Sequence, residues 1–307
     1  MKRRRLGRTN LQVSEIGMGG AWLLGRKNDL PVEHGVATIR RALDLGITYL
    51  DTAECYIGGR SEEVFGAALQ GYSGEYVLAT KCGHRVGSLA PRSAPFDWTR
   101  ESVLESLDVS LSRLSRPSVD VFQLHTPEEP PLDAIFGPGG ALEGLREARE
   151  RGLVRFLGIT GRNLEFLTRC VESDAFDTLI VFQRFDLLEQ SALPLFRAAR
   201  ERDVGVVLGS PLRLGLFGSA RDELAARLPN EDREHVAALD ALLRDEPGGT
   251  TASAIRFCLS PDEVSVVLSG AASPGEIESA ASAADRPLSP ALAQEVYRLG
   301  AGKVRAL

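Results

Sequence analysis

Eight short apolar segments, each followed by a stretch with helical periodicity, are the feature that most limits how this 307-residue chain can fold. The segments are continuous runs rich in Val, Ile and Leu, which is typical of strands buried on both faces of a parallel sheet. They lie at residues 14–20, 47–53, 76–82, 119–126, 154–160, 178–185, 204–211 and 264–270. Eight β–α units in a chain of this length predict an α/β fold, a single (β/α)8 TIM barrel that spans residues 1–307 as one domain.

The segments before and between these strands support the same fold. The opening "RRRLGRTNLQVSE" predicts a β-hairpin ahead of the first barrel strand, and residues 32–46, 99–114, 141–152 and 193–203 have amphipathic helical spacing. Helix starts are indicated by Ser61 and Thr99, each followed by acidic residues. A doubly wound open sheet is the alternative, but "GMGGAWLLG" lacks the G-x-G-x-x-G spacing of its phosphate turn. The long connections 83–98 and 212–232 are typical of lids or substrate walls.

Composition excludes several classes of partner. The net charge of −6 argues against nucleic acid and anionic membrane surfaces, and we interpret the basic start "MKRRR" as a solvated edge. No apolar run reaches the roughly 18 residues of a membrane span, and the polar "LGRTNLQVSE" after the basic start does not resemble a signal peptide. The four cysteines have no zinc-like spacing. We therefore expect a cytoplasmic protein with reduced thiols, no metal ion and a small-molecule partner, and the oligomeric state stays open.

Polar residues stand at the ends of three consecutive predicted strands. Asp51 ends the second strand, Lys81 the third and His125 the fourth, and Tyr56 follows Asp51 by five residues. A barrel collects the carboxyl ends of its strands on one face, and strand alternation gives these three side chains the same inward orientation. Each alone has an ordinary explanation, as a turn cap, a solvated lysine or a core histidine. Together they indicate a candidate active site.

The combination suggests proton transfer. A phenol has a pKa of about 10, and we expect the ammonium of Lys81 to lower the pKa of Tyr56, with Asp51 keeping Lys81 charged. His125 is suited to hydrogen-bond a substrate oxygen. Such a site can protonate an alkoxide as it forms from a carbonyl, or run the reverse reaction. It lacks an electron sink, which implies an external reductant.

These residues resemble the catalytic tetrad of the aldo-keto reductases, which are (β/α)8 barrels that use a nicotinamide cofactor. "DTAECY" followed by "GRSEEVFGAAL" is similar to the family motif D-T-A-x-x-Y-G-x-G-x-S-E, with Ile57 where glycine is usual, and "VLATK" and "VDVFQLH" resemble its third and fourth strands. The resemblance implies an NAD(P)-dependent oxidoreductase that interconverts a carbonyl and an alcohol. Tyr56 would be the general acid/base, Lys81 and Asp51 would tune it, and His125 would orient the carbonyl. "GITG" and "SPLRLGLF" look closest to a branch of sugar dehydrogenases.

The same resemblance implies positions for substrate and cofactor. Substrate contacts fall to Trp22, Tyr56 and His125. The nicotinamide amide falls to Thr160 and Gly161, where the family usually has Ser and Asn, and to Gln183, while Gly209 replaces the usual stacking aromatic. The further implied cofactor contacts are Gly20, Ala21, Asp51, Ser210, Leu212, Ser269, Gly270, Ser273 and Glu276.

The segment after the eighth strand bears on the choice between NADP and NAD. No Lys or Arg occurs between Arg256 and Arg286, and Glu276 stands where the family usually has an arginine for the 2′-phosphate. A carboxylate repels that phosphate but can hydrogen-bond a free ribose hydroxyl. NAD is therefore expected to be tolerated or preferred. The alternative is that Glu276 is a solvated helix residue and that Arg213 or Arg221 meets the phosphate.

Other functions stay open at this point. Strand-end lysines in barrels can form Schiff bases, so a lyase using Lys81 is one alternative. A non-catalytic nucleotide-binding or regulatory member of the same fold is another. A metal-dependent hydrolase is the weakest, because the later strand ends offer no carboxylates or further histidines to complete a coordination shell.

Overall fold

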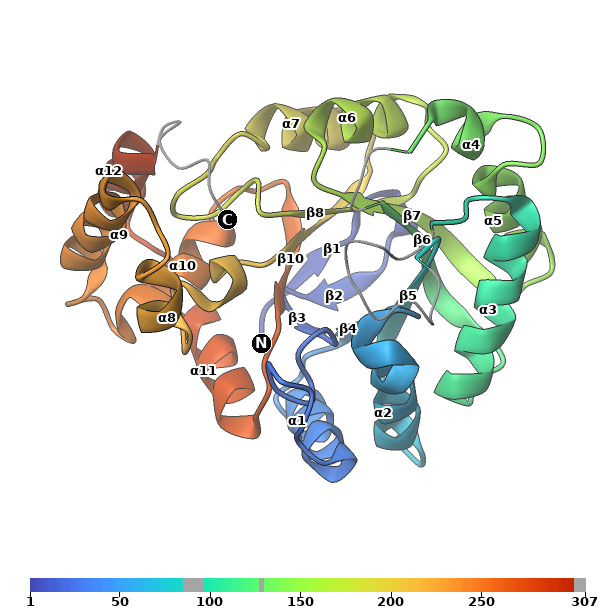
Figure 1. The fold of residues 1–307 in the computed structure, drawn as a ribbon, viewed down its shortest axis with the longest axis horizontal. Helices are drawn as coiled ribbons and strands as arrows, with labels where there is room; N and C mark the ends of the chain where they lie inside the picture. The colour runs from blue at the N-terminus through green and yellow to red at the C-terminus, as the bar shows by residue number, and fades with distance from the viewer. Residues whose placement is uncertain (85–95, 127–129, 301–307) are drawn as a thin grey trace.

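The computed structural model describes residues 1–84, 96–126 and 130–300, which form a closed barrel of parallel strands surrounded by helices (Figure 1). The strands follow one another around the barrel in sequence order, and the last pairs with the first. They are β3 (Ile16–Gly19), β4 (Tyr49–Asp51), β5 (Val77–Cys82), β6 (Val119–Thr126), β7 (Val154–Gly161), β8 (Thr178–Phe182), β9 (Gly205–Gly209) and β10 (Val264–Ser269). The predicted (β/α)8 TIM barrel is confirmed, and each strand lies within its predicted segment except for one added residue in β7.

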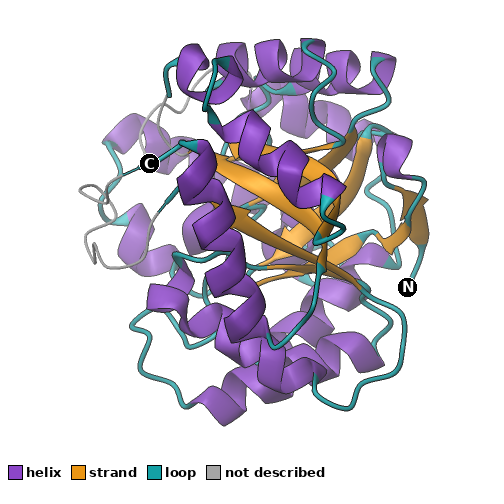
Figure 2. Ribbon diagram, turned by 90° about the vertical axis from the view of Figure 1, so that its right-hand side faces the viewer, coloured by secondary structure: helices purple, strands orange, loops and turns teal. Residues whose placement is uncertain are grey.

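Helices cover the outside of the barrel (Figure 2). They are α1 (Val32–Asp44), α2 (Arg60–Leu69), α3 (Arg100–Leu114), α4 (Leu132–Phe136), α5 (Ala141–Glu150), α6 (Leu164–Glu172), α7 (Leu193–Glu201), α8 (Arg221–Ala225), α9 (Asn230–Leu243), α10 (Gly249–Cys258), α11 (Pro274–Ala284) and α12 (Pro290–Gly300). Among the described residues, none of these helices has the length and apolar character needed to cross a membrane.

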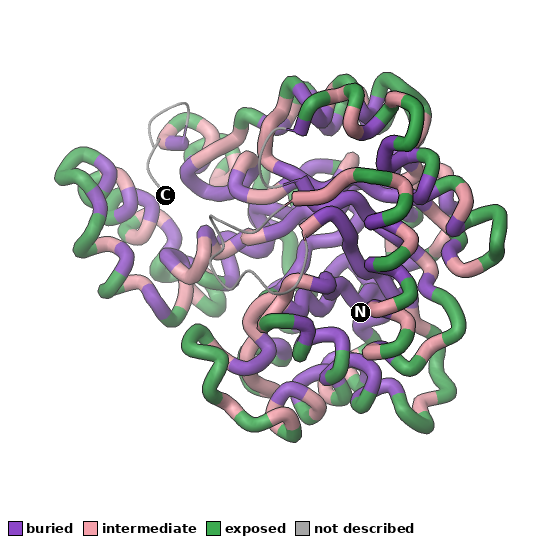
Figure 3. The backbone as a smooth tube through the Cα atoms, turned by 45° about the vertical axis from the view of Figure 1, so that its right-hand side comes forward, coloured by how far each residue is buried: buried purple, intermediate pink, exposed green. Residues whose placement is uncertain are grey.

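Two apolar layers hold the barrel together, and the strands between them are buried on both faces (Figure 3). Inward-pointing side chains such as Tyr49, Val121, Ile180 and Val266 fill the interior of the barrel. The larger layer lies between the strands and the helices and includes Phe65, Phe122 and Phe196. The inward positions continue toward the carboxyl ends of β4, β5 and β6, where Asp51, Lys81 and His125 lie.

Only one of the two predicted helix caps is correct. The side chain of Thr99 accepts a hydrogen bond from the backbone N–H of Ser102 and caps α3. The residue before α2 is Gly59, in a left-handed conformation, and Ser61 lies inside that helix. The hydroxyl of Ser61 donates instead to the backbone carbonyl of Gly20, at 2.9 Å, because tertiary packing brings the end of β3 next to it.

A β-hairpin closes the amino-terminal end of the barrel, as predicted. Strand β1 (Arg3–Arg5) pairs antiparallel with β2 (Gln12–Ser14), and the 3-10 turn η1 (Gly7–Thr9) joins them. Leu6 and Val13 pack into the interior of the barrel. The hydroxyl of Ser265 donates to the carbonyl of Arg5 at 2.8 Å, which ties the hairpin to the start of β10.

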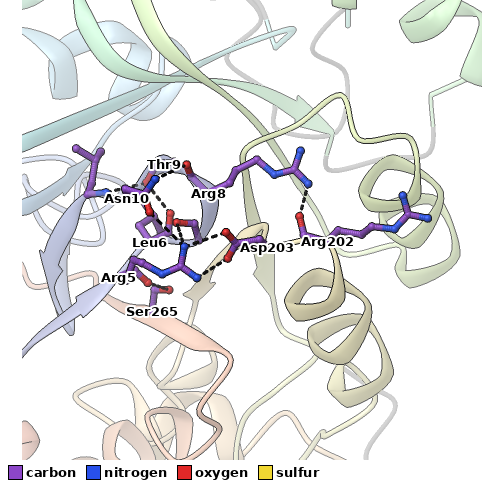
Figure 4. A network of polar contacts seen from close by, with 10 residues as sticks. Arg5, Leu6, Arg8, Thr9, Asn10, Arg202, Asp203 and Ser265 are labelled. Atoms are coloured by element: carbon purple, nitrogen blue, oxygen red, sulfur yellow. Dashed lines mark hydrogen bonds and ion pairs between the residues drawn. The ribbon is translucent and has the colours of Figure 1, made fainter.

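The interpretation of the basic start as a solvated edge is wrong for Arg4 and incomplete for Arg5. Arg4 is largely buried and donates to the carbonyl of Val264 at 2.8 Å and to the carboxylate of Glu15 at 3.2 Å. Arg5 is half-exposed and forms a two-pronged ion pair with Asp203, just before β9 (Figure 4). Arg4 and Arg5 therefore attach the hairpin to the barrel through partners that are distant in the sequence.

The connection at residues 212–232 is folded rather than an open lid. It contains the 3-10 turn η3 (Arg213–Gly215), helix α8 and the start of α9. The buried guanidinium of Arg213 pairs with the buried carboxylate of Asp186 at 2.8 Å, and the other oxygen of Asp186 accepts the backbone N–H groups of Leu188 and Glu189. The pair joins the segments after β8 and β9. Most of the other long connection, 83–98, lies outside the described residues.

We predict that Arg213→Met lowers the free energy of unfolding by about 3–5 kcal/mol at neutral pH, because it leaves Asp186 buried without its cation. Burial already raises the pKa of Asp186 while Arg213 lowers it, so the pKa in the variant is higher still. A carboxyl group with a raised folded-state pKa favours the folded state most at acid pH and loses that contribution as pH rises. Urea unfolding should therefore show a smaller deficit at mildly acidic than at neutral pH.

The matched control is the double variant Arg213→Met/Asp186→Asn. Its amide oxygen still accepts the N–H groups of Leu188 and Glu189, but it carries no charge. We expect it to recover much of the lost stability and to show no such pH dependence. A deficit that is the same at both pH values in the single variant contradicts the prediction.

Candidate active site

The structure brings together the four side chains that the sequence analysis singled out. Lys81 Nζ donates to Asp51 Oδ1 at 2.5 Å and to the carbonyl oxygen of Thr52 at 2.8 Å, and the side chains of Lys81 and Asp51 are each only 2% exposed. The ammonium lies 4.6 Å from the centroid of the Tyr56 ring. The ring of His125 meets that of Tyr56 edge to face, with centroids 5.9 Å apart. The end of the barrel thus holds an acid, a cation, a phenol and an imidazole in contact.

Gln123 completes this cluster and was not identified from the sequence as a site residue. Its side-chain amide donates to Asp51 Oδ2 at 2.9 Å and is fully buried. With Lys81 on the other oxygen, the Asp51 carboxylate is held on both sides, as a buried charge requires. Gln123 could have been found from its position two residues before His125, because strand alternation points both side chains into the barrel.

Lys81 is held as a cation. Burial lowers the pKa of this amine, but the charge of Asp51, the neighbouring Tyr56 and the hydrogen bonds to both raise it to about 12. A buried ammonium is stable here because its carboxylate partner and a backbone carbonyl replace the lost water. The sequence-based expectation that Asp51 keeps Lys81 charged agrees with this geometry.

The expectation that Lys81 lowers the pKa of Tyr56 below its usual value is wrong in its net direction. Burial raises the pKa of the phenol to about 12, and the lowering effect of Lys81 is the smaller contribution, opposed further by the charge of Asp51. The physical reason is that a phenolate loses its hydration on burial, while the cation beside it is already paired with a carboxylate. Tyr56 is therefore a protonated donor at neutral pH.

His125 is a neutral imidazole. Burial, followed by the charges of Lys81 and His84, holds its pKa well below the usual range. A neutral imidazole has one N–H donor and one acceptor nitrogen. Cys55 Sγ lies 3.5 Å from His125 Nδ1, which places a thiol on one side of the ring.

Ile57 has a left-handed backbone, with a φ angle of 55°. The similar family motif usually has glycine at this position. This conformation favours glycine and is uncommon for a β-branched residue. It costs roughly 1–2 kcal/mol relative to ordinary geometry. The side chain is half-buried and packs against the outer apolar layer, so packing compensates part of this strain immediately beside Tyr56.

The predicted cofactor residues gather at the same end of the barrel as the tetrad. Thr160 and Gly161 end β7, Gln183 follows β8, Ser210 follows β9, and Ser269 ends β10. Gln183 and Ser210 have positive φ angles of 58° and 59°, a form of strain that clusters at functional sites.

One orphaned group among these residues fits a bound nicotinamide. In the described part of the chain, the buried hydroxyl of Thr160 has no hydrogen-bond partner. Buried polar groups are rarely left unpaired in a folded protein. Thr160 is therefore able to receive a hydrogen-bonding ligand such as a carboxamide.

The positions near the end of β3 have mainly structural contacts. The N–H of Gly20 donates to the carbonyl of Asp51 at 2.8 Å, and a Cβ at Gly20 would lie 2.4 Å from Ser61 Oγ. Trp22 is half-buried, and its ring lies so close to Gly270 that a Cβ there would be 2.9 Å from it. Trp22 therefore bridges the segments that follow β3 and β10.

The start of α11 carries the residues predicted for the adenosine end of the cofactor. Ser273 caps the helix by accepting the N–H of Glu276, and Glu276 Oε2 accepts the N–H of Ala272 at 2.8 Å. Glu276 is exposed and keeps its other oxygen available. The two arginines proposed as alternative phosphate partners are both engaged, Arg213 with Asp186 and Arg221 with Asp240. In this structure, both named arginines are therefore paired with carboxylates.

The model of the Aldo/keto reductase family matches residues 15–300 of this chain. L-galactose dehydrogenase of Arabidopsis thaliana is 30% identical over 282 residues, which cover 90% of this chain and 85% of that protein. D-threo-aldose 1-dehydrogenase of a Pseudomonas species is 29% identical, with 87% of this chain and 88% of that protein covered. Both similarities extend over nearly the whole barrel.

A solved structure has the same fold. The holo form of aldo-keto reductase AKR11C1 from Bacillus halodurans superposes with a TM-score of 0.83 and 26% sequence identity, covering 97% of this chain and 96% of that one. The agreement extends to the enclosing helices as well as to the barrel strands, because a score of this size over the whole length requires both.

For the polar cluster itself, we predict that Asp51→Asn lowers the free energy of unfolding by about 3–5 kcal/mol at neutral pH, because Lys81 is left buried without its counter-charge. Without Asp51, burial lowers the pKa of Lys81, and a base with a depressed folded-state pKa makes stability rise with pH. Urea unfolding should show the stability deficit shrinking toward alkaline pH.

Gln123→Leu is the control variant, because it removes only an amide donor to Asp51. It should lower the free energy of unfolding by about 1.5–3 kcal/mol and show no recovery at alkaline pH. Equal pH profiles for the two variants would refute this account.

Proposed function

The chain belongs to the aldo/keto reductase family, and from this premise we propose that it is an NAD(P)-dependent oxidoreductase. It interconverts an aldehyde, ketone or sugar carbonyl with the corresponding alcohol. The main support for this proposal is the Asp51–Lys81 ion pair, whose ammonium nitrogen lies 4.6 Å from the centroid of the Tyr56 ring. This arrangement suits proton transfer at an oxygen and supplies no electrons of its own.

In the reductive direction, Tyr56 donates its phenolic proton to the oxygen of the carbonyl as that oxygen gains negative charge. Lys81 remains protonated and stabilises the phenolate that is left. Asp51 and Gln123 hold Lys81 and its charge in place. In the oxidative direction, the phenolate takes the proton from the alcohol. The nicotinamide cofactor, when bound, supplies or accepts the hydride.

His125 and Trp22 complete the proposed substrate site. The neutral imidazole of His125 can donate an N–H to the carbonyl oxygen and so direct it toward Tyr56. Trp22 forms an apolar wall between the ends of β3 and β10. Thr160 and Gln183 are the residues that would hold the carboxamide of the cofactor. The similarity to two sugar dehydrogenases supports a sugar or another polyhydroxy compound as substrate.

A Schiff-base lyase is disfavoured. A nucleophilic lysine has to lose its proton, and lysines that form Schiff bases have lowered pKa values. Here the pKa of Lys81 is raised to about 12, and its ammonium already donates to Asp51 and Thr52. A non-catalytic member of the family does not account for the retained tetrad, because its Asp51–Lys81 ion pair is costly to bury.

The cofactor preference is proposed to favour NAD. Glu276 places a negative charge at the start of α11, where a 2′-phosphate would approach, and Arg213 and Arg221 are engaged elsewhere. A free 2′-hydroxyl can instead donate a hydrogen bond to this carboxylate.

Replacing Tyr56 tests the proposed reaction. Tyr56→Phe keeps the ring but removes the acidic proton, and we expect kcat for reduction of a simple aldehyde or aldose to fall by about 100-fold to 10,000-fold. Binding of the reduced cofactor, measured by fluorescence titration, should change little. Tyr72→Phe is the matched control, because this tyrosine lies beyond α2 near Tyr76, and it should retain full activity. Turnover in Tyr56→Phe equal to that of the parent protein excludes Tyr56 as the general acid/base.

Fluorescence titrations with NADH and NADPH test the cofactor preference. The protein should bind NADH at least as tightly as NADPH. Glu276→Gln keeps an acceptor for Ala272 but removes the charge, and it should tighten NADPH binding by about fivefold, equivalent to the roughly 1 kcal/mol of a charge pair near 4 Å in water. Glu278→Gln on the same helix, which loses an ion pair with Arg41, should leave both affinities unchanged. Clearly tighter NADPH binding by the parent protein would overturn the preference.

A further inference from the structure

A thiol and two imidazoles converge beside the tetrad. Cys55 follows β4, His84 follows β5, and His125 lies in β6, so three neighbouring strands bring together residues that are far apart in the sequence. One potential ligand atom from each lies within 4.8 Å of the others. The sequence alone predicts no metal ion, because its four cysteines have no zinc-like spacing.

The distances are close to those of a coordinated zinc ion. Tetrahedral Zn²⁺, with Zn–S near 2.3 Å and Zn–N near 2.0–2.1 Å, separates a thiolate sulfur from an imidazole nitrogen by about 3.5–3.6 Å. Cys55 Sγ and His125 Nδ1 are already 3.5 Å apart. Two zinc-bound nitrogens are about 3.3–3.4 Å apart. Because all three ligand atoms lie within 4.8 Å of one another, a shift of roughly 1.5 Å or less at His84 closes the site.

The donor chemistry also suits zinc. One sulfur and two imidazole nitrogens form a borderline-soft set that favours Zn²⁺ over Mg²⁺ or Ca²⁺. The buried Nδ1 of His84 has no hydrogen-bond partner within the described ranges, although buried polar atoms nearly always have one. The ring of His84 packs against those of Phe96 and His125, with centroid separations of 4.7 Å and 5.7 Å. These contacts hold His84 next to the other two ligand residues.

The charge balance is acceptable. Binding converts the Cys55 thiol to a zinc thiolate and releases one proton to solvent, so the occupied site carries one net positive charge. The neighbouring charges of Lys81 and Asp51 cancel each other in their ion pair. Three protein ligands leave the fourth tetrahedral position to a water molecule.

We propose that Cys55, His84 and His125 form a Zn²⁺-binding site, and that zinc bound there inhibits carbonyl turnover because coordination fixes the His125 ring, which the proposed reaction needs to orient the carbonyl. The binding half of this inference is independent of the proposed function, whereas the inhibition half rests on it. The inhibition is reversible, since a chelator that removes the ion restores the free imidazole.

Metal binding is tested without any substrate. Co²⁺ added to the reduced protein should produce the intense near-ultraviolet absorption of a cobalt thiolate, and Zn²⁺ should displace it. Calorimetry of Zn²⁺ binding in two buffers of different ionisation enthalpy should show release of about one proton from the thiol. Cys55→Ser should abolish the thiolate band, and His84→Gln should weaken zinc binding at least about tenfold, the smaller of the losses seen when even a supporting residue of a metal site is removed.

Two matched variants control for zinc bound elsewhere. His34→Gln removes an imidazole that hydrogen-bonds Ala272, and Cys170→Ala removes a buried thiol of α6. Both should bind Zn²⁺ like the parent protein. The absence of a cobalt thiolate band, or zinc affinity that is unchanged in Cys55→Ser, overturns the site.

Inhibition is then measured on the active enzyme. Zn²⁺ should inhibit carbonyl reduction by the parent protein, EDTA should restore it, and Cys55→Ser and His84→Gln should each need at least about tenfold more zinc for the same inhibition. Tight zinc binding with unchanged turnover overturns the inhibitory role while leaving the binding site intact. A parent protein that binds zinc but reduces no carbonyl at all contradicts the proposed function instead.

Discussion

The ion pair between Asp51 and Lys81 is the interaction on which the rest of this site depends. Two opposite charges buried at the end of a barrel are costly to desolvate, and the cost is tolerable because every charged atom has a partner. Gln123 holds the second oxygen of Asp51, and the carbonyl of Thr52 accepts from Lys81. These partners come from three adjacent parallel strands, and only the closed barrel brings their carboxyl ends to one place.

The Asp51–Lys81 ion pair has almost no net charge. Its main contribution to Tyr56 is therefore to hold the ammonium beside the ring. Because Asp51 offsets the charge of Lys81, burial dominates and raises the pKa of the phenol to about 12. The result is a phenol that is protonated at neutral pH, as the proposed reduction of a carbonyl requires. Strained backbone at Ile57, Gln183 and Ser210 occurs at the same end of the barrel, which is consistent with a site shaped for binding at some expense of local stability.

The convergence that forms the tetrad also places Cys55 and His84 next to His125. In the two proposals, one imidazole serves both for hydrogen bonding to a substrate oxygen and for coordination of Zn²⁺. A second buried ion pair, between Arg213 and Asp186, lies at the same end of the barrel. It fixes the segment after β9 and engages the guanidinium of Arg213.

The amino-acid sequence is enough to predict the barrel, the order of its strands and the convergence of Asp51, Lys81 and His125. It could do so because continuous apolar strands, helical periodicity and strand alternation are local patterns with direct geometric meaning. Other features become visible only in the folded protein: the partners of Arg4, Ser61 and Gln123, the ion pair of Arg213, the left-handed backbone of Ile57 and the raised pKa of Tyr56. Hydrogen bonding, strain and burial in these cases depend on neighbours that the chain supplies from distant segments, and no local pattern encodes their distance or their exclusion of water.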